Sequence, residues 1–324
     1  MKPRESESPL DAPAAGTQAT EAFELLSDET RLAILVALWE HADPFGDDDA
    51  VRFSDLQSRV GTADSGQFNY HLDRLDGHFV ESVDDGYRLT NAGRKLVRSV
   101  IAGTGIEAPE LEPTRVDISC TLCGAAVEVQ YERGQVYVSC TECEGLWNGD
   151  GDDDHSGHLA KFSLDPAGLE GRSPEEIYAA AWVNTFQTIF SMIEGVCPTC
   201  TGQVERELAV CRDHDADGRC EECGHRSRGV ARFRCTVCKR TTRATLGVLA
   251  KYHPRVVALC YDHGLALQYE FNELSHIKAR FDRTNTDVEF RSVDPPRARL
   301  TTTIDGDEAW VELDETLSVV AVSD

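Results

Sequence analysis

CTLCGAAVEVQYERGQVYVSCTEC, residues 120–143, contains two Cys-x-x-Cys pairs separated by two alternating segments and an Arg133-Gly134 turn. A gap of two residues lets both thiols of a pair reach one tetrahedral metal ion, and two pairs complete a structural zinc site. Because the alternating segments predict a strand, a turn and a strand, the hairpin should return the second pair to the first. We therefore predict a zinc ribbon. Its ligands are Cys120, Cys123, Cys140 and Cys143.

Four more ligand pairs lie between residues 197 and 238, and the chain limits which of them can share an ion. The segment 203–210 has no turn signal. As a strand it should therefore separate Cys211/His214, which follow it, from Cys197/Cys200, which precede it. Only DHDADGR, residues 213–219, supplies a turn. We therefore predict a nested register. The inner ligands, at the hairpin tip, are Cys211, His214, Cys220 and Cys223, and the outer ligands, at its base, are Cys197, Cys200, Cys235 and Cys238.

Two other registers remain open at this point. Sequential pairing would join Cys220/Cys223 to Cys235/Cys238, and an alternating cross-brace would join Cys220/Cys223 to Cys197/Cys200. A looser seventh pair, Cys260/His263, has no fourth pair to complete a site. Its simpler interpretation is a half-buried cysteine and a surface histidine around a helix end. Three structural zinc ions are therefore expected.

Composition limits the class of protein. The chain has 324 residues, which is room for two or three domains, and a formal net charge of −25. Few lysines and an acid excess spread along the chain resemble proteins of halophilic archaea; an ordinary acidic protein is the alternative. Paired cysteines and the absence of a secretory segment near Met1 predict a reducing compartment, the cytoplasm. No apolar run approaches the ~20 residues of a membrane span.

The N-terminal third has helical periodicity. Residues 1–20 are rich in Pro, Ser, Ala and Glu and predict a disordered leader. From Glu21 onward the pattern predicts two helices that are separated at Ser27-Asp28. FSDLQSRV predicts a third helix with Ser54 as its N-cap, and Asp64 with Gln67 predicts the start of a fourth. A short hairpin over 78–89 and a helix over 90–103 should follow.

This order of elements is that of a winged helix-turn-helix, in which the second helix of the motif enters the major groove of DNA. The apolar residues of the fourth helix, Phe68, Leu72 and Leu75, fall on one stripe, so its polar residues should face outward. We predict a DNA contact from this polar face and from the following hairpin. The candidate residues are Ser65, Gln67, Asn69, Tyr70, Arg74 and Arg88.

Four segments resemble the DNA-binding domain of ArsR-type transcriptional regulators, in the subgroup common among haloarchaea. They are AFELLSDETRLAILVAL (22–38), FSDLQSRVG (53–61), DSGQFNYHLDRLDGHFV (64–80) and DGYRLTNAGRKLV (85–97). The remainder resembles the cysteine-rich C-terminal part of the same proteins. The resemblance implies a regulator that binds double-stranded DNA. The metal-sensing cysteine pattern of that family is missing, because residues 30–40 contain no Cys, so toxic-metal sensing is not implied.

Three later segments complete the prediction. Ser173, Pro174 and two glutamates start a helix over 173–195 whose apolar residues cover more than one stripe, so it should be buried on two sides, in a dimer or within one chain. Alternating segments from Asp287 predict an antiparallel meander. DGDDDHSGHL, residues 150–159, predicts a solvated acidic loop that contains His155 and His158.

Charge is unfavourable for DNA binding, because residues 21–101 hold more acidic than basic side chains. Molar salt would screen this repulsion, and Arg74, Arg88, Arg94 and Lys95 lie where contacts are expected. Residues 226–255 contain basic but no acidic side chains. This window either compensates a negatively charged four-cysteinate zinc site or makes a second contact with phosphate.

We predict an α+β chain with five segments. These are a leader (1–20), a winged helix-turn-helix (21–105), a zinc ribbon (106–165), a connecting or dimerisation helix (166–195) and a second zinc-binding domain (196–324). The predicted function is a homodimeric, sequence-specific DNA-binding transcriptional regulator with structural zinc. The alternative is an adaptor of the transcription machinery without sequence specificity. An enzyme is not expected, because the sequence has no nucleophile elbow, no phosphate-binding glycine loop and no open zinc position.

Overall fold

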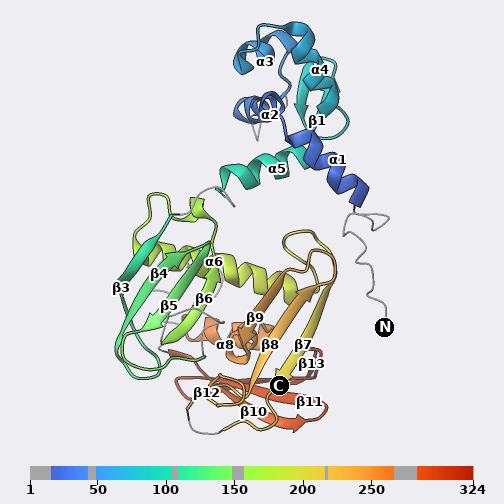
Figure 1. Cartoon of the computed structure of the whole chain (residues 1–324). Coiled ribbons are helices and arrows are strands. Elements are labelled where there is room, and N and C mark those ends of the chain that lie inside the picture. The colour runs from blue at the N-terminus through green and yellow to red at the C-terminus, as the bar shows by residue number, and fades with distance from the viewer. Residues whose placement is uncertain are drawn as a thin grey trace, which may run out of the picture. The chain divides into compact units, whose positions relative to one another are not determined.

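The computed structural model describes residues 16–42, 49–103, 109–147, 157–215, 218–265 and 283–323. The chain divides into two compact units, Met1–Ile106 and Glu107–Asp324 (Figure 1). Helices occur beside several antiparallel sheets, so the predicted α+β class is confirmed. Among the described residues, no helix combines the length and the apolar character needed to cross a membrane.

The first unit is mainly helical, with one two-stranded hairpin. Apolar side chains of its second, third and fourth helices form a core in which Ile34, Leu56, Phe68 and Leu72 are fully buried. Its first helix begins at Gly16, so residues 16–20, predicted to belong to a disordered leader, are helical; residues 1–15 lie outside the described residues. The elements are α1 (Gly16–Leu26), α2 (Glu29–His41), α3 (Phe53–Val60), α4 (Ser65–Leu75), β1 (Val80–Val83), β2 (Gly86–Leu89) and α5 (Asn91–Ile101).

Side-chain caps start three of these helices. Asp28 accepts a hydrogen bond from the Arg31 amide, Asp64 from the Gly66 and Gln67 amides, and Thr90 from the Gly93 amide. The predicted Ser54 cap is wrong, because the N-cap of α3 is Arg52, two residues earlier, and its side chain makes no capping hydrogen bond. The physical reason is non-local. Val51 pairs with Tyr87 of the hairpin through two backbone hydrogen bonds, and the chain turns into the helix directly afterwards.

The second unit begins with a four-stranded antiparallel sheet in the order β3-β4-β5-β6. The first half of helix α6 packs on this sheet. Val127, Val129 and Val138 from the strands form one core with Tyr178 and Trp182 from the helix. The elements are β3 (Leu111–Ser119), β4 (Ala126–Glu132), β5 (Gln135–Cys140), β6 (His158–Ser163), the 3-10 turn η2 (Pro166–Gly168) and α6 (Pro174–Ile193).

Two further antiparallel sheets complete this unit, and their order along the chain confirms the predicted hairpin and meander. Leu208 and Phe233 of the first sheet share a core with Leu300 and Val311 of the second. The elements are β7 (Val204–Val210), β8 (Gly229–Cys235), β9 (Thr241–Thr245), α7 (Leu246–Ala250), α8 (Pro254–Asp262), β10 (Asn285–Val293), β11 (Pro296–Ile304), β12 (Asp307–Leu313) and β13 (Val319–Val322).

Helix α6 connects the two cores of the second unit (Figure 1). Its start is the predicted one, since Ser173 and Glu176 form a reciprocal capping box. Tyr178 and Trp182 lie in the first core, whereas Met192 lies in the second. The two cores follow one another along the helix, and Phe190, one of its apolar residues, is 52% exposed, so burial on two sides is achieved only in part within one chain.

Candidate metal centres and an exposed polar helix

Three groups of four ligands come together in the second unit, and in each group the ligand atoms lie within 4.8 Å of one another. The grouping is the nested one; neither the sequential nor the cross-brace arrangement is found. The groups are the ribbon site (Cys120, Cys123, Cys140, Cys143), the base site (Cys197, Cys200, Cys235, Cys238) and the tip site (Cys211, His214, Cys220, Cys223).

The ribbon site lies where the hairpin of β4 and β5 brings its ends together. Arg133 and Gly134 form the turn with left-handed backbone angles, and the ladder runs back to pair Val127 with Cys140. The Cys120 and Cys143 sulfurs are 3.7 Å apart. This separation fits a tetrahedral ion, because Zn–S bonds of about 2.3 Å place sulfurs about 3.8 Å from one another.

The base site has the same geometry at the open end of the β7–β8 hairpin. Val204 pairs with Cys235 in the ladder, so the chain entering β7 and the chain leaving β8 lie side by side. The Cys197 and Cys238 sulfurs are 3.6 Å apart, and those of Cys200 and Cys235 are 3.5 Å apart. These distances again fit four thiolates around one ion.

The tip site lies beyond the other end of the same hairpin and includes a histidine. Nδ1 of His214 is 3.5 Å from the Cys223 sulfur, while Nε2 is 3.1 Å from the Arg226 carbonyl oxygen. Nδ1 therefore faces the cluster, and Nε2–H can donate to the backbone. Such a second hydrogen bond fixes the ring and its tautomer for metal binding.

The tip site also contacts the ribbon, which the sequence did not predict. The Arg226 amide donates to the Leu146 carbonyl at 2.9 Å, and its guanidinium donates to the Gly145 carbonyl at 2.9 Å. Trp147 and His225 form a β-bridge. Since residues 145–147 follow Cys143, these contacts join the tip site to the ribbon site. Mostly backbone groups form them, so residue type gave no signal.

Local hydrogen bonds favour the thiolate form that metals bind at some of these cysteines, whereas burial raises the pKa of others, such as Cys120 and Cys143. Burial acts to raise the pKa of Cys197, but the amides of Cys200 and Thr199 and the neighbouring thiols outweigh it and lower the pKa to about 6. The same balance lowers the pKa of Cys140 to about 7. The ribbon and base sites therefore each contain a thiol prepared for coordination.

The predicted DNA-contact residues of α4 lie together on one side of the helix. Phe68, Leu72 and Leu75 are fully buried on the other side. Asn69 donates to Asp73 at 2.8 Å, and the Ser65 hydroxyl lies 3.0 Å from the Gln57 amide nitrogen of α3. The helix thus presents an exposed polar surface. Its exposed members are Ser65, Gln67, Asn69, Tyr70, Asp73 and Arg74.

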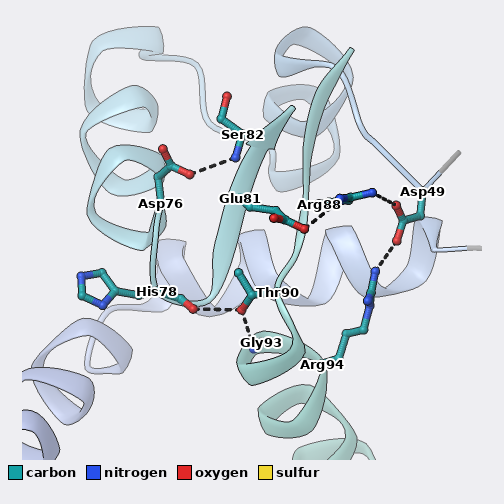
Figure 2. A network of polar contacts seen from close by, with 9 residues as sticks. All are labelled: Asp49, Asp76, His78, Glu81, Ser82, Arg88, Thr90, Gly93 and Arg94. Carbon is teal, nitrogen blue, oxygen red and sulfur yellow. Dashed lines mark hydrogen bonds and ion pairs between the residues drawn. The ribbon is translucent and has the colours of Figure 1, made fainter. Parts of the chain in front are cut away.

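Arg88, in contrast, is engaged within its own unit. Figure 2 shows its guanidinium between Glu81, at 2.8 Å, and Asp49, at 3.8 Å. Hydrogen bonding and charge from Glu81, with a smaller effect of Asp49, raise the pKa of Arg88. Arg94 also contacts Asp49. The structure therefore supplies carboxylate partners for two of the basic residues that the sequence suggested for DNA.

The basic window 226–255 also has internal partners. Arg228 donates to the carbonyl groups of Cys211 and Arg212, next to the tip site. On the exposed face of the β7–β9 sheet, Arg234 pairs with Glu205 at 2.6 Å and Arg232 lies 4.0 Å from Glu207. Arg228 thus joins two chain segments next to the tip site, whereas Arg232 and Arg234 neutralise carboxylates of the same sheet and not a four-cysteinate zinc site.

Two other expectations are corrected. Cys260 is fully buried among apolar side chains of α8 and the meander, not half-buried, and His263 lies beside Asp305 and Asp307. His158 is not in a solvated loop, because it begins β6, is only 2% exposed and stacks on Trp147. His155 lies outside the described residues. Neither His158 nor His263 joins a metal group among the described residues.

The chain is thus an α+β protein with three Cys/His clusters, and two family models match its two units. The Domain of unknown function (DUF7351) matches residues 117–319, which is more than half of the chain. The protein belongs to this family. The Domain of unknown function (DUF7347) matches residues 19–100, within the first unit. No curated protein and no solved structure matches the chain.

Proposed function

We propose that the protein is a sequence-specific transcriptional regulator that binds double-stranded DNA as a homodimer in the cytoplasm of a halophilic archaeon. The first unit would be an ArsR-type winged helix-turn-helix, with α4 as the recognition helix and β1–β2 as the wing. Zinc ions in the ribbon, base and tip sites would hold the second unit together. The protein would have no catalytic activity.

The observation that carries this proposal is the amphipathic character of α4. Its apolar side chains are fully buried in the core formed with α2 and α3, so the helix is held firmly. Its exposed side carries Gln67, Asn69 and Arg74, side chains that can hydrogen-bond to base edges in the major groove. A polar helix surface that follows a short helix and precedes a hairpin is the arrangement of a winged recognition helix.

The metal assignment rests on ligand chemistry. Thiolates with at most one imidazole, at tetrahedral spacing, favour zinc over the oxygen-preferring Mg²⁺ and Ca²⁺. All four positions of each cluster are protein ligands, which leaves no position for an activated water. A structural role follows, because a bound ion would join two ligand pairs that are far apart in the sequence.

The charges of the first unit predict that it contacts few DNA phosphates. Arg88 and Arg94 are paired with carboxylates, so Arg74 and Lys95 remain of the four basic residues that the sequence analysis placed at the DNA. Each neutralised phosphate contributes about −0.9 to the slope of log K against log salt. A regulator with so few contacts should therefore keep its affinity at high salt, where its acidic surface is screened.

The pairing of Arg88 and Arg94 with carboxylates also favours the second candidate, an adaptor that binds protein partners through the first unit. The two candidates are distinguished by using the zinc-loaded full chain to select DNA from a pool of random double-stranded sequences, at the salt concentration of its cytoplasm. The proposal predicts enrichment of one shared sequence. An adaptor would bind no DNA, or would enrich no common sequence.

A further inference from the structure

Two arginine side chains of the first unit converge on one carboxylate. The Asp49 carboxylate is 3.8 Å from Nη1 of Arg88, on β2, and also contacts Nη2 of Arg94, on α5 (Figure 2). In addition, Nε of Arg88 donates to Glu81 at 2.8 Å. Guanidinium groups bind the oxygens of carboxylates and of phosphates in the same way. The Asp49 carboxylate therefore occupies a position that suits a phosphate oxygen.

The segment that carries Asp49 is fastened without these ion pairs. Val51, two residues further on, pairs with Tyr87 of β2 through two backbone hydrogen bonds of 2.9 and 3.0 Å, and Val51 is only 2% exposed. The two backbones are in close contact, because a Cβ added to Gly86 would lie 2.2 Å from the Val51 carbonyl oxygen. Backbone pairing and apolar burial thus hold this segment on β2, and the carboxylate of Asp49 is not required for that purpose.

Both arginines stay accessible in this arrangement. The side chains of Arg88 and Arg94 are 40% and 31% exposed, whereas that of Asp49 is 16% exposed. Ion pairs near the surface contribute only about 0–1 kcal/mol, and high salt weakens them further. An incoming phosphate could therefore replace the carboxylate at small cost, because the two arginines would keep an anionic partner.

We propose that Arg88 and Arg94 form a binding site for a phosphate of the DNA backbone, and that Asp49 closes this site in the unbound protein. Binding of DNA exchanges one anion for another, since the phosphate takes the place of the Asp49 carboxylate between the two guanidinium groups. This inference rests on the proposed function, because DNA supplies the phosphate. The carboxylate lowers the affinity for every DNA sequence alike, because phosphate contacts carry no sequence information.

A purely structural ion pair predicts a different result. If Asp49 only stabilises the first unit, its replacement should leave the affinity for DNA unchanged or should lower it. If Asp49 competes with phosphate, its replacement should raise the affinity, and this gain should require the two arginines. The sign of the change in affinity therefore separates the two roles.

The affinity of the zinc-loaded full chain for the DNA that the parent chain selects tests the proposal. Asp49→Asn removes the competing charge and should lower Kd about fivefold without changing the sequence preference, and Asp49→Ser should act in the same way. Glu40→Gln, at an exposed glutamate of α2, changes the net charge equally and should change Kd by less than about twofold. Circular dichroism verifies that each variant is folded.

A mutant cycle shows whether the gain acts through the arginines. In a chain with Arg88 and Arg94 both replaced by glutamine, addition of Asp49→Asn should lower Kd no more than Glu40→Gln does. A fall in Kd for Asp49→Asn that is no larger than that for Glu40→Gln, a rise in Kd, or a gain that persists without the two arginines overturns this proposal alone. A parent chain that selects no DNA overturns the proposed function and this proposal together.

Discussion

The two units of this protein differ in the features that stabilise each of them internally. The first unit, Met1–Ile106, contains no cysteine and depends on an apolar core and on capped helices. The second unit, Glu107–Asp324, contains all twelve cysteines, and its three ligand clusters lie at the ends of hairpins. The comparison teaches that a framework of metal-ligand clusters and a cysteine-free apolar core can be separated in one chain. The predictions below change one unit at a time.

Removal of metal should have the largest effect. A structural zinc site contributes about 10–16 kcal/mol of apparent binding free energy, so a chelator should unfold the hairpins around the ribbon, base and tip sites. Hydrogen exchange of the full chain should then show lost protection in β4, β5, β7 and β8, with α2 and α4 still protected. Simultaneous loss of protection in α4 would contradict the separation.

Loss of one tip ligand should affect the second unit in part. Cys220→Ser should reduce the metal content from three ions to two, because β7 and β8 hold the base site independently. Native mass spectrometry counts the ions, and hydrogen exchange should increase at residues 144–147, which contact the tip site. Glu221→Gln changes the same loop but no ligand, and should retain three ions. Loss of the base ion in Cys220→Ser would show that the two ends of the hairpin are not separable.

A cavity in the first unit should destabilise that unit alone. Leu72 is fully buried, so Leu72→Ala should lower the free energy of unfolding of the first unit by about 2–5 kcal/mol. The metal content should stay at three ions. Tyr70→Ala, on the exposed side of the same helix, should change the stability by less than about 0.5 kcal/mol. Release of zinc by the Leu72 variant would be the contrary outcome.

Local chemistry allowed much of this structure to be predicted. Ligand spacing and strand length decided the nested grouping, because a strand without a turn separates its ends. The Asp64 and Ser173 caps could also be predicted from the sequence, since each side chain bonds to amides two or three residues away. The stripe of Phe68, Leu72 and Leu75 likewise fixed which side of α4 is buried.

The features that escaped prediction depend on distant residues. The start of α3 is set by pairing between Val51 and Tyr87, not by Ser54. His158 is buried because Trp147 stacks on it, although it follows an acidic segment. Gly145 shows the same limit. Its φ of +77° and the 2.2 Å that would separate an added Cβ from the His158 carbonyl show a close backbone approach that no residue pattern reveals.

The central claim is that α4 of the first unit reads DNA, and the affinity of two arginine variants tests it most directly. Arg74→Ala in the zinc-loaded chain should weaken binding to the selected DNA by about 1–3 kcal/mol and relax the sequence preference. Arg115→Ala removes the same charge from an arginine of β3 that is 75% exposed, and should leave binding unchanged. Equal affinities and equal sequence preferences for Arg74→Ala, Arg115→Ala and the parent chain would contradict the account.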